Sequence, residues 1–114
     1  MYKRQSESDI EPSFQGSEME IKILNEIFQN KHRINFERIG VARGNDKDDL
    51  KLIKGLGPFI EKKFNALGIY QFAQIAKFKN DDIEKINKIM QLDPEDYITK
   101  SWIEDAKSRL ESPN

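Results

Sequence analysis

Residues 50–60 read LKLIKGLGPFI and are the most informative stretch of the chain. An apolar run leads into Lys54-Gly55-Leu56-Gly57-Pro58, and a second apolar pattern follows at Ile60, Phe64 and Leu67. Gly55 and Gly57 lack a Cβ, so each can take a positive φ and bring the backbone close to another surface. Pro58 suits the first turn of a helix, because its φ is fixed there and its missing N–H is not needed. The stretch predicts two short helices joined by a glycine hairpin.

This hairpin has the properties of a phosphate-binding site. The amides at the start of the second helix carry a partial positive charge, which favours an anion. We expect the amides around Leu56 to Phe59 to hold one phosphate while lysines neutralise its neighbours and no side chain reads bases. Lys62 and Lys63 are both expected on the surface. The candidate nucleic-acid-binding residues are therefore Lys54, Gly55, Leu56, Gly57, Pro58, Phe59, Lys62 and Lys63.

Residues 49–69 resemble a helix-hairpin-helix motif. More narrowly, residues 48–110 are similar to a bacterial family of small helix-hairpin-helix domains. Its members read Asp-Asp-Leu-Lys-x-Ile-x-Gly-x-Gly-Pro, then Leu-Gly-Ile-Tyr, then Trp-Ile-x-x-Ala-Lys, and the three pieces stand here at Asp48–Pro58, Leu67–Tyr70 and Trp102–Lys107. The resemblance implies an all-α, SAM-like bundle that contacts the DNA phosphate backbone without sequence preference.

The resemblance carries two further implications. Polymerase-type hairpins imply a monovalent cation at main-chain carbonyls, here those of Lys51, Ile53 and Leu56; no other metal and no cofactor is expected. The chain departs from the family between Gln91 and Lys100, where relatives usually have a loop containing Gly and Arg. Acidic residues take its place here, so the contact that the loop makes in relatives is not carried over: Asp93, Glu95 and Asp96.

Length and charge set bounds on the fold and the partners. The chain has 114 residues, 37% of them hydrophobic, which allows one small core. Its formal net charge is only -1, so the whole molecule is not a polycation. Residues 47–79 hold seven Lys and three Asp or Glu, whereas residues 80–114 hold five basic and nine acidic residues. The hairpin half is therefore basic and the C-terminal half acidic, although a helical domain also carries lysines for solubility alone.

A bundle of about five short helices is expected over residues 47–111. Asp48 or Asp49 would cap the first, Gly68 would end the second in a left-handed conformation, and Asn80 would cap the fourth. The third is expected from Tyr70 to Phe78. The last would open with a capping box at Ser101 and place Trp102 in the core rather than on a base-stacking surface. Tyr70 and Tyr97 are expected to pack at the rim, and residues 112–114 to be a disordered tail.

The N-terminal part divides into a lead-in and an anchored segment. Residues 1–16 are polar and predict disorder, and residues 17–46 form the second unit. Ser17 and Glu20 have capping-box spacing before an amphipathic helix at about 18–31. Its apolar stripe either packs on the hairpin domain or, through residues 18–39, on a protein partner or second copy. Alternation from Ile34 to Ile39 is strand-like, and we interpret it as an extended arm anchored on the bundle.

The first five residues, Met1-Tyr2-Lys3-Arg4-Gln5, are what GTG TAT AAG AGA CAG encodes when GTG is read as a start. That nucleotide string belongs to a transposon end used to prepare sequencing libraries. We hypothesise that these residues are adapter-derived and that the natural protein continues upstream of Ser6. A genomic read across this junction that lacks the adapter codons supports the hypothesis, whereas one that contains them refutes it.

Catalysis is not expected. The carboxylate pairs Asp48-Asp49 and Asp81-Asp82 stand at helix starts, where capping explains them. The chain has one histidine, His32, and no cysteine, so a thiolate metal site is impossible. No run in the visible chain is long and apolar enough to span a membrane, and a cytoplasmic location is expected. Two functions remain open: a non-catalytic, sequence-independent DNA-backbone-binding module, or a structural or protein-interaction domain forming the C-terminal part of a larger protein or assembly.

Overall fold

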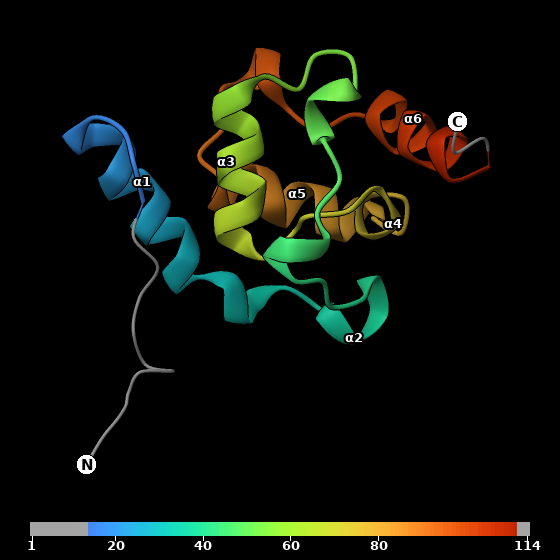
Figure 1. Ribbon diagram of the computed structural model, residues 1–114, viewed down its shortest axis with the longest axis horizontal. Helices are drawn as coiled ribbons and strands as arrows, with labels where there is room; N and C mark the ends of the chain where they lie inside the picture. Colours follow the sequence, from blue (N-terminus) through green and yellow to red (C-terminus); the bar gives the residue numbers. More distant parts are fainter. Residues whose placement is uncertain (1–13, 112–114) are drawn as a thin grey trace.

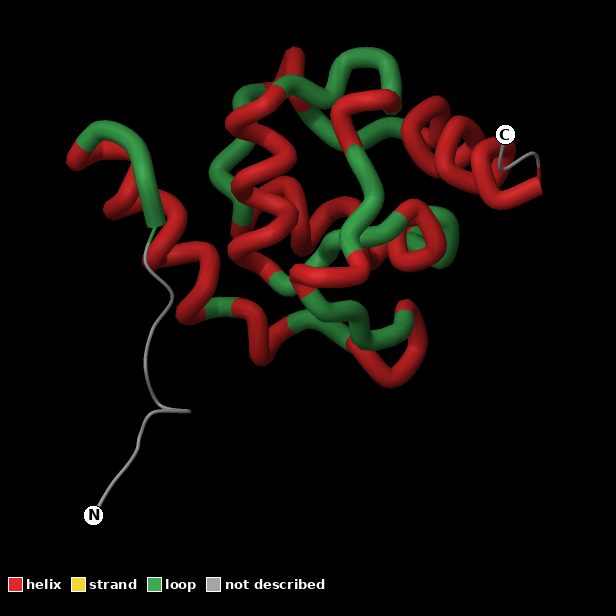
Figure 2. The backbone as a smooth tube through the Cα atoms, viewed as in Figure 1, coloured by secondary structure: helices red, strands yellow, loops and turns green. Residues whose placement is uncertain are grey.

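The computed structural model describes residues 14–111, and every regular element in this range is helical (Figure 2). The α-helices are α1 (Glu18–Gln29), α2 (Phe36–Ile39), α3 (Pro58–Leu67), α4 (Phe72–Ile75), α5 (Asn80–Ile89) and α6 (Lys100–Glu111). Short 3₁₀ turns lie at Lys31–Arg33, Gly44–Asp46, Leu50–Leu52 and Pro94–Asp96. The predicted all-α class is confirmed. Residues 1–13 of the expected lead-in, the adapter hypothesis and the expected tail at 112–114 lie outside the described residues.

The N-terminal helix α1 begins with the predicted capping box. The Glu20 amide donates to Ser17 Oγ at 3.2 Å, and the Ser17 amide donates to Glu20 Oε1 at 3.1 Å. Leu24 and Ile27 are buried, and α1 lies alongside α3 (Figure 1). The apolar stripe therefore packs within the chain, which is the first of the two arrangements expected for it.

The segment expected to be an extended arm contains the short helix α2. Asn35 Oδ1 accepts a hydrogen bond from the Arg38 amide at 3.3 Å, which caps α2, and Gly40 ends it with a φ of 96°. A helical turn places Phe36 and Ile39 on one side, so both can face the bundle, whereas a strand would direct them to opposite faces. The extended conformation was wrong for residues 36–39, but anchoring is confirmed: Ile34 and Ile39 are buried and Phe36 packs partly against the core.

Other boundaries also differ from expectation. Helix α5 has Lys79 in its cap position and begins at Asn80, so Asn80 does not cap it. The first helix of the hairpin is only the 3₁₀ turn Leu50–Leu52, and the third helix is shortened to Phe72–Ile75. Helix α6 begins at Lys100, so Ser101 lies inside its first turn and does not cap it. Helix ends are the least certain part of any sequence pattern, because side chains beyond the element compete for the terminal amides. One such competitor is Asp48, whose Oδ2 accepts from the Phe72 amide at 2.8 Å.

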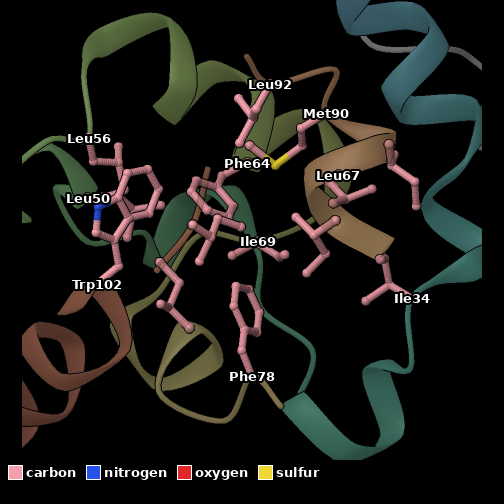
Figure 3. Close-up of a cluster of buried hydrophobic side chains, with 14 of the residues drawn as sticks. Ile34, Leu50, Leu56, Phe64, Leu67, Ile69, Phe78, Met90, Leu92 and Trp102 are labelled. Carbon is pink, nitrogen blue, oxygen red and sulfur yellow. The ribbon is translucent and has the colours of Figure 1, made fainter. Parts of the chain in front are cut away.

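The hydrophobic core surrounds Phe64 of α3 (Figure 3). Its ring centroid lies 6.3 Å from that of Phe78 and 6.3 Å from that of Trp102. Trp102 is 6% exposed, which confirms it as a core residue. Figure 3 shows side chains that are far apart in the sequence, from Ile34 after α1 to Trp102 of α6, gathered in this cluster. The hairpin is therefore built directly on the core of the bundle.

Polar contacts fasten the N-terminal segment to the bundle. Gln74 is 1% exposed; its amide nitrogen donates to the Gly40 carbonyl at 2.9 Å, and its oxygen accepts from the Tyr70 amide at 2.7 Å. Arg38 of α2 forms an ion pair with Asp82 at the start of α5. Because these buried groups are satisfied, they fix the path of the chain rather than destabilise it.

Within residues 14–111, no helix combines the length and apolar composition that crossing a bilayer requires.

Candidate nucleic-acid interface

Two carboxylates accept hydrogen bonds from backbone amides of the 3₁₀ turn that leads into the hairpin. Asp49 Oδ1 accepts from the Lys51 amide at 3.2 Å, and Glu61 Oε2 accepts from the Leu50 amide at 3.0 Å. Gly55 has a φ of 94°, and a Cβ at this position would lie 3.4 Å from Trp102 Nε1. Glycine is therefore favoured at residue 55 for its backbone conformation, since the nearest atom of the indole leaves room for ordinary contact with a Cβ.

The amides that remain free at the start of α3 differ from those expected. The Leu56 amide donates to the Ile53 carbonyl at 3.1 Å, so it is not available to a phosphate, and the Leu56 side chain is buried. Pro58 has no N–H, and the Glu61 amide donates to the Gly57 carbonyl at 3.0 Å. Within residues 14–111, no acceptor is bonded to the amides of Gly57, Phe59 and Ile60. These three amides lie at the N-terminal end of a ten-residue helix, where the partial positive charge of the helix favours an anion.

Gly57 does not adopt a positive φ, and its missing side chain instead leaves the backbone accessible. Its φ is -84°, which other residues also adopt. A Cβ at Gly57 would meet nothing within 4 Å, so the backbone here faces open space. An anion can therefore approach the α3 amides from outside the bundle.

The lysines around the hairpin divide by burial. Lys54 and Lys62 are exposed, as a phosphate site requires. Lys63 is only 7% exposed, which contradicts the expectation that it lies on the surface. Its Nζ lies 3.4 Å from the Gln91 carbonyl oxygen and 4.9 Å from the centroid of the Phe59 ring. The same contact half-covers Phe59. Lys63 is therefore part of the packed bundle, and the hairpin presents fewer exposed cations than expected.

Burial lowers the pKa of Lys63 below its ordinary value of 10.5, although the nearby Asp93 and Asp96 carboxylates act in the opposite direction. Between the folded pKa and 10.5, the unfolded chain binds more protons than the folded one, so stability rises with pH in that window. We expect the free energy of unfolding of the natural chain, relative to Lys63→Met, to increase as pH is raised toward 10.5. Urea denaturation at several alkaline pH values measures this difference; parallel pH profiles would show that Lys63 is not desolvated.

The carboxylates of the described residues have structural roles or are solvent-exposed. Asp82 Oδ2 accepts from the Lys79 amide at 2.7 Å, and Asp48 and Asp49 cap backbone amides as described above. In the range 14–111, one group of carboxylates lies close enough together to share an ion, formed by Asp93, Glu95 and Asp96. It occupies the loop that departs from the family, and Lys63 lies beside it. Clusters of exposed acidic groups are common without a metal, so this one does not indicate metal-dependent chemistry.

The implied monovalent-cation site remains an expectation. The Ile53 carbonyl already accepts from the Leu56 amide but has a second lone pair.

Sequence reasoning missed Arg109 of α6, whose Nη2 donates to the Leu52 carbonyl at 2.7 Å. Arg109 also pairs with Asp105 at 3.1 Å. Nothing in the local sequence signals this contact, because the two residues are 57 positions apart.

The 3₁₀ turn, the glycine hairpin with a left-handed Gly55, and the following α3 that starts at Pro58 together make a helix-hairpin-helix unit. The family comparison agrees: residues 50–109 match the model described as the RS2/RL21/YNQ2 HHH domain. The chain belongs to this family. The match confirms the resemblance inferred from the hairpin and its companion motifs.

The relatives are segments of bacterial ribosomal proteins. This chain is 46% identical over 59 residues to the large ribosomal subunit protein bL21 of Hyphomonas neptunium. The alignment covers 52% of this chain and 28% of that protein. The bL21 protein of Mesorhizobium japonicum is 42% identical over 62 residues, 54% of this chain and 27% of the relative. The small ribosomal subunit protein uS2 of Rhodopseudomonas palustris is 38% identical over 65 residues. This alignment covers 57% of this chain and 19% of that protein.

The chain thus spans about a quarter of the length of the bL21 relatives and about a fifth of the uS2 relative. What is shared is the helix-hairpin-helix region. No solved structure matches the chain.

Proposed function

We propose that this chain binds the phosphate backbone of nucleic acid through its hairpin, without reading the base sequence and without catalysis. The observation that carries the proposal is the set of free amides of Gly57, Phe59 and Ile60, with open space beside Gly57 and the exposed Lys54 and Lys62 nearby in the sequence. Amides at a helix start favour an anion, and lysines add sequence-independent attraction. Ion pairs of this kind are strongly weakened by salt.

RNA is the nucleic acid that the relatives favour. The names of bL21 and uS2 assign them to ribosomal subunits, which are built on RNA. The helix-hairpin-helix resemblance, by contrast, points to DNA. Backbone phosphates are common to both, so the hairpin alone would bind either. A binding experiment therefore includes both nucleic acids.

Charge reversal at the two exposed lysines tests the hairpin. We expect Lys54→Glu combined with Lys62→Glu to weaken binding at least tenfold at low salt, on the order of 1.4 kcal/mol or more, and to reduce the salt slope by about two. Fluorescence anisotropy of labelled RNA and DNA at low and physiological salt measures both quantities. Lys88→Glu combined with Lys100→Glu makes the same charge change on exposed residues of the C-terminal half and serves as the control.

Equal losses in the two double variants would mean that net charge alone governs binding, which contradicts a site at the hairpin. Absence of binding even at low salt would favour the second candidate function, a structural or protein-interaction domain within a ribosomal or other assembly. The burial of Lys63 supports that candidate, because it leaves the hairpin with a small cationic surface.

A further inference from the structure

Two hollows lie toward the end of α3 that is opposite the hairpin, and they are lined by the C-terminal half of α3, the end of α1 and the segment that follows α1. Figure 1 shows these three elements next to one another. We call the two hollows together the groove. Their volumes are about 250 Å³ and 530 Å³. Lys31, Gly68 and Tyr70 line both hollows, so the two are adjacent. Much of the lining comes from residues 14–44, which lie outside the region matched by the family model.

The groove is positively charged. Lys62 and Lys31 line the first hollow, and Lys31, His32 and Arg43 line the second. All four side chains are exposed. Among the described residues that line either hollow, none is acidic. In a chain with a net charge of -1, such a one-sided surface favours an anionic occupant.

Aromatic rings line the same hollows as the cations Lys31, Lys62 and Arg43. Phe28 lines the first hollow, Phe36 the second, and Tyr70 both, and all three rings are half-buried. Lys31 Nζ lies 4.6 Å from the centroid of the Phe28 ring. The first hollow also contains Asn65, whose buried Oδ1 has no hydrogen-bond partner within residues 14–111.

We propose that this groove holds unpaired nucleotides of a single-stranded nucleic acid. Aromatic faces and cations in one groove are the features that bind single strands, because every base can stack and every phosphate is an anion. The bases of a duplex are already stacked and paired, so a duplex cannot enter in this way. An acidic peptide would use the cations but would leave the aromatic faces unused.

The proposal rests on the proposed function and extends it. Lys62 stands four residues after Pro58, about 6 Å further along α3. It therefore borders both the hairpin and the groove. A strand whose phosphate contacts the α3 amides can continue past Lys62 and place a following base on Tyr70, because the Phe28 ring is already contacted by Lys31 and Phe14.

The test compares labelled oligouridylate and oligothymidylate with RNA and DNA duplexes of the same length, by fluorescence anisotropy with the full chain. We expect the single strands to bind at least about fivefold more tightly than the duplexes. Tyr70→Leu should weaken single-strand binding by about 5- to 100-fold, because it removes a stacking surface. Tyr97→Leu is the matched control at a tyrosine outside the groove. Circular dichroism establishes that both variants are folded.

A second pair of variants keeps the test independent of the tyrosine. Lys31→Glu combined with Arg43→Glu changes two exposed groove residues, and we expect it to lower single-strand affinity at least about tenfold with a smaller effect on duplex binding. Equal affinity of the natural chain for strands and duplexes, or unchanged single-strand binding in both groove variants, would overturn the groove proposal while leaving the hairpin intact. Failure of the natural chain to bind any of the four probes would overturn both.

Discussion

Replacing Trp102 with alanine is expected to lower the free energy of unfolding by about 3–5 kcal/mol. The indole is 6% exposed, lies against Phe64 and supports the backbone of Gly55. Its removal leaves a cavity beneath the hairpin that the neighbouring backbone cannot fill without moving. A single small domain is stable by only about 5–15 kcal/mol, so the loss takes a large share of the total. Urea denaturation followed by circular dichroism measures it.

Tyr97→Ala provides the control for aromatic truncation. Tyr97 is 42% exposed, and we expect its replacement to change the free energy of unfolding by less than about 1 kcal/mol. If Trp102→Ala were as mild as Tyr97→Ala, the indole would not support the hairpin, and the core described around Phe64 would be wrong.

Charge reversal at Lys63 is expected to destabilise the fold by at least about 3 kcal/mol. The variant Lys63→Glu places a buried carboxylate beside the Gln91 carbonyl and near Asp93 and Asp96, where a cation now lies. Neither hydrogen bonding nor charge compensates the new group. Lys62→Glu is the matched control, because its exposed neighbouring position should make the same reversal cost no more than about 0.5 kcal/mol.

Equal stability of the two reversals would contradict the burial of Lys63. The difference in burial between Lys62 and Lys63 also affects how nucleic-acid binding is tested. A variant that changes Lys63 loses affinity through unfolding as well as through charge, so loss of binding cannot be assigned to the hairpin. Lys54 and Lys62 are the positions at which charge can be changed while the fold is kept.

Local signals in the sequence predicted the parts of the fold that depend on few neighbours. Ser17 and Glu20 form the expected capping box because both partners lie within one turn. Gly68 adopts the expected left-handed conformation, with φ 96° and ψ 13°, at the end of α3. The glycine hairpin followed by Pro58 was recognisable for the same reason.

Features that depend on distant parts of the chain were not predictable in this way. Lys63 is buried because the loop after α5 supplies Gln91 to cover it, and no pattern within α3 shows this. The alternation from Ile34 to Ile39 fits a strand and a single helical turn equally well, and the Asn35 cap selects the helix. The groove likewise combines α1, α3 and the segment after α1, which only the tertiary structure brings together.

Amide NMR of the full chain, titrated with a short single-stranded RNA at low salt, tests most directly whether the hairpin binds phosphate. We expect the largest shifts of the hairpin region at the amides of Gly57, Phe59 and Ile60, with shifts of α5 amides much smaller. The Leu56 amide, which already donates to Ile53, should move less than Gly57. Shifts that leave residues 57–60 unchanged while binding saturates would contradict a phosphate site at the start of α3.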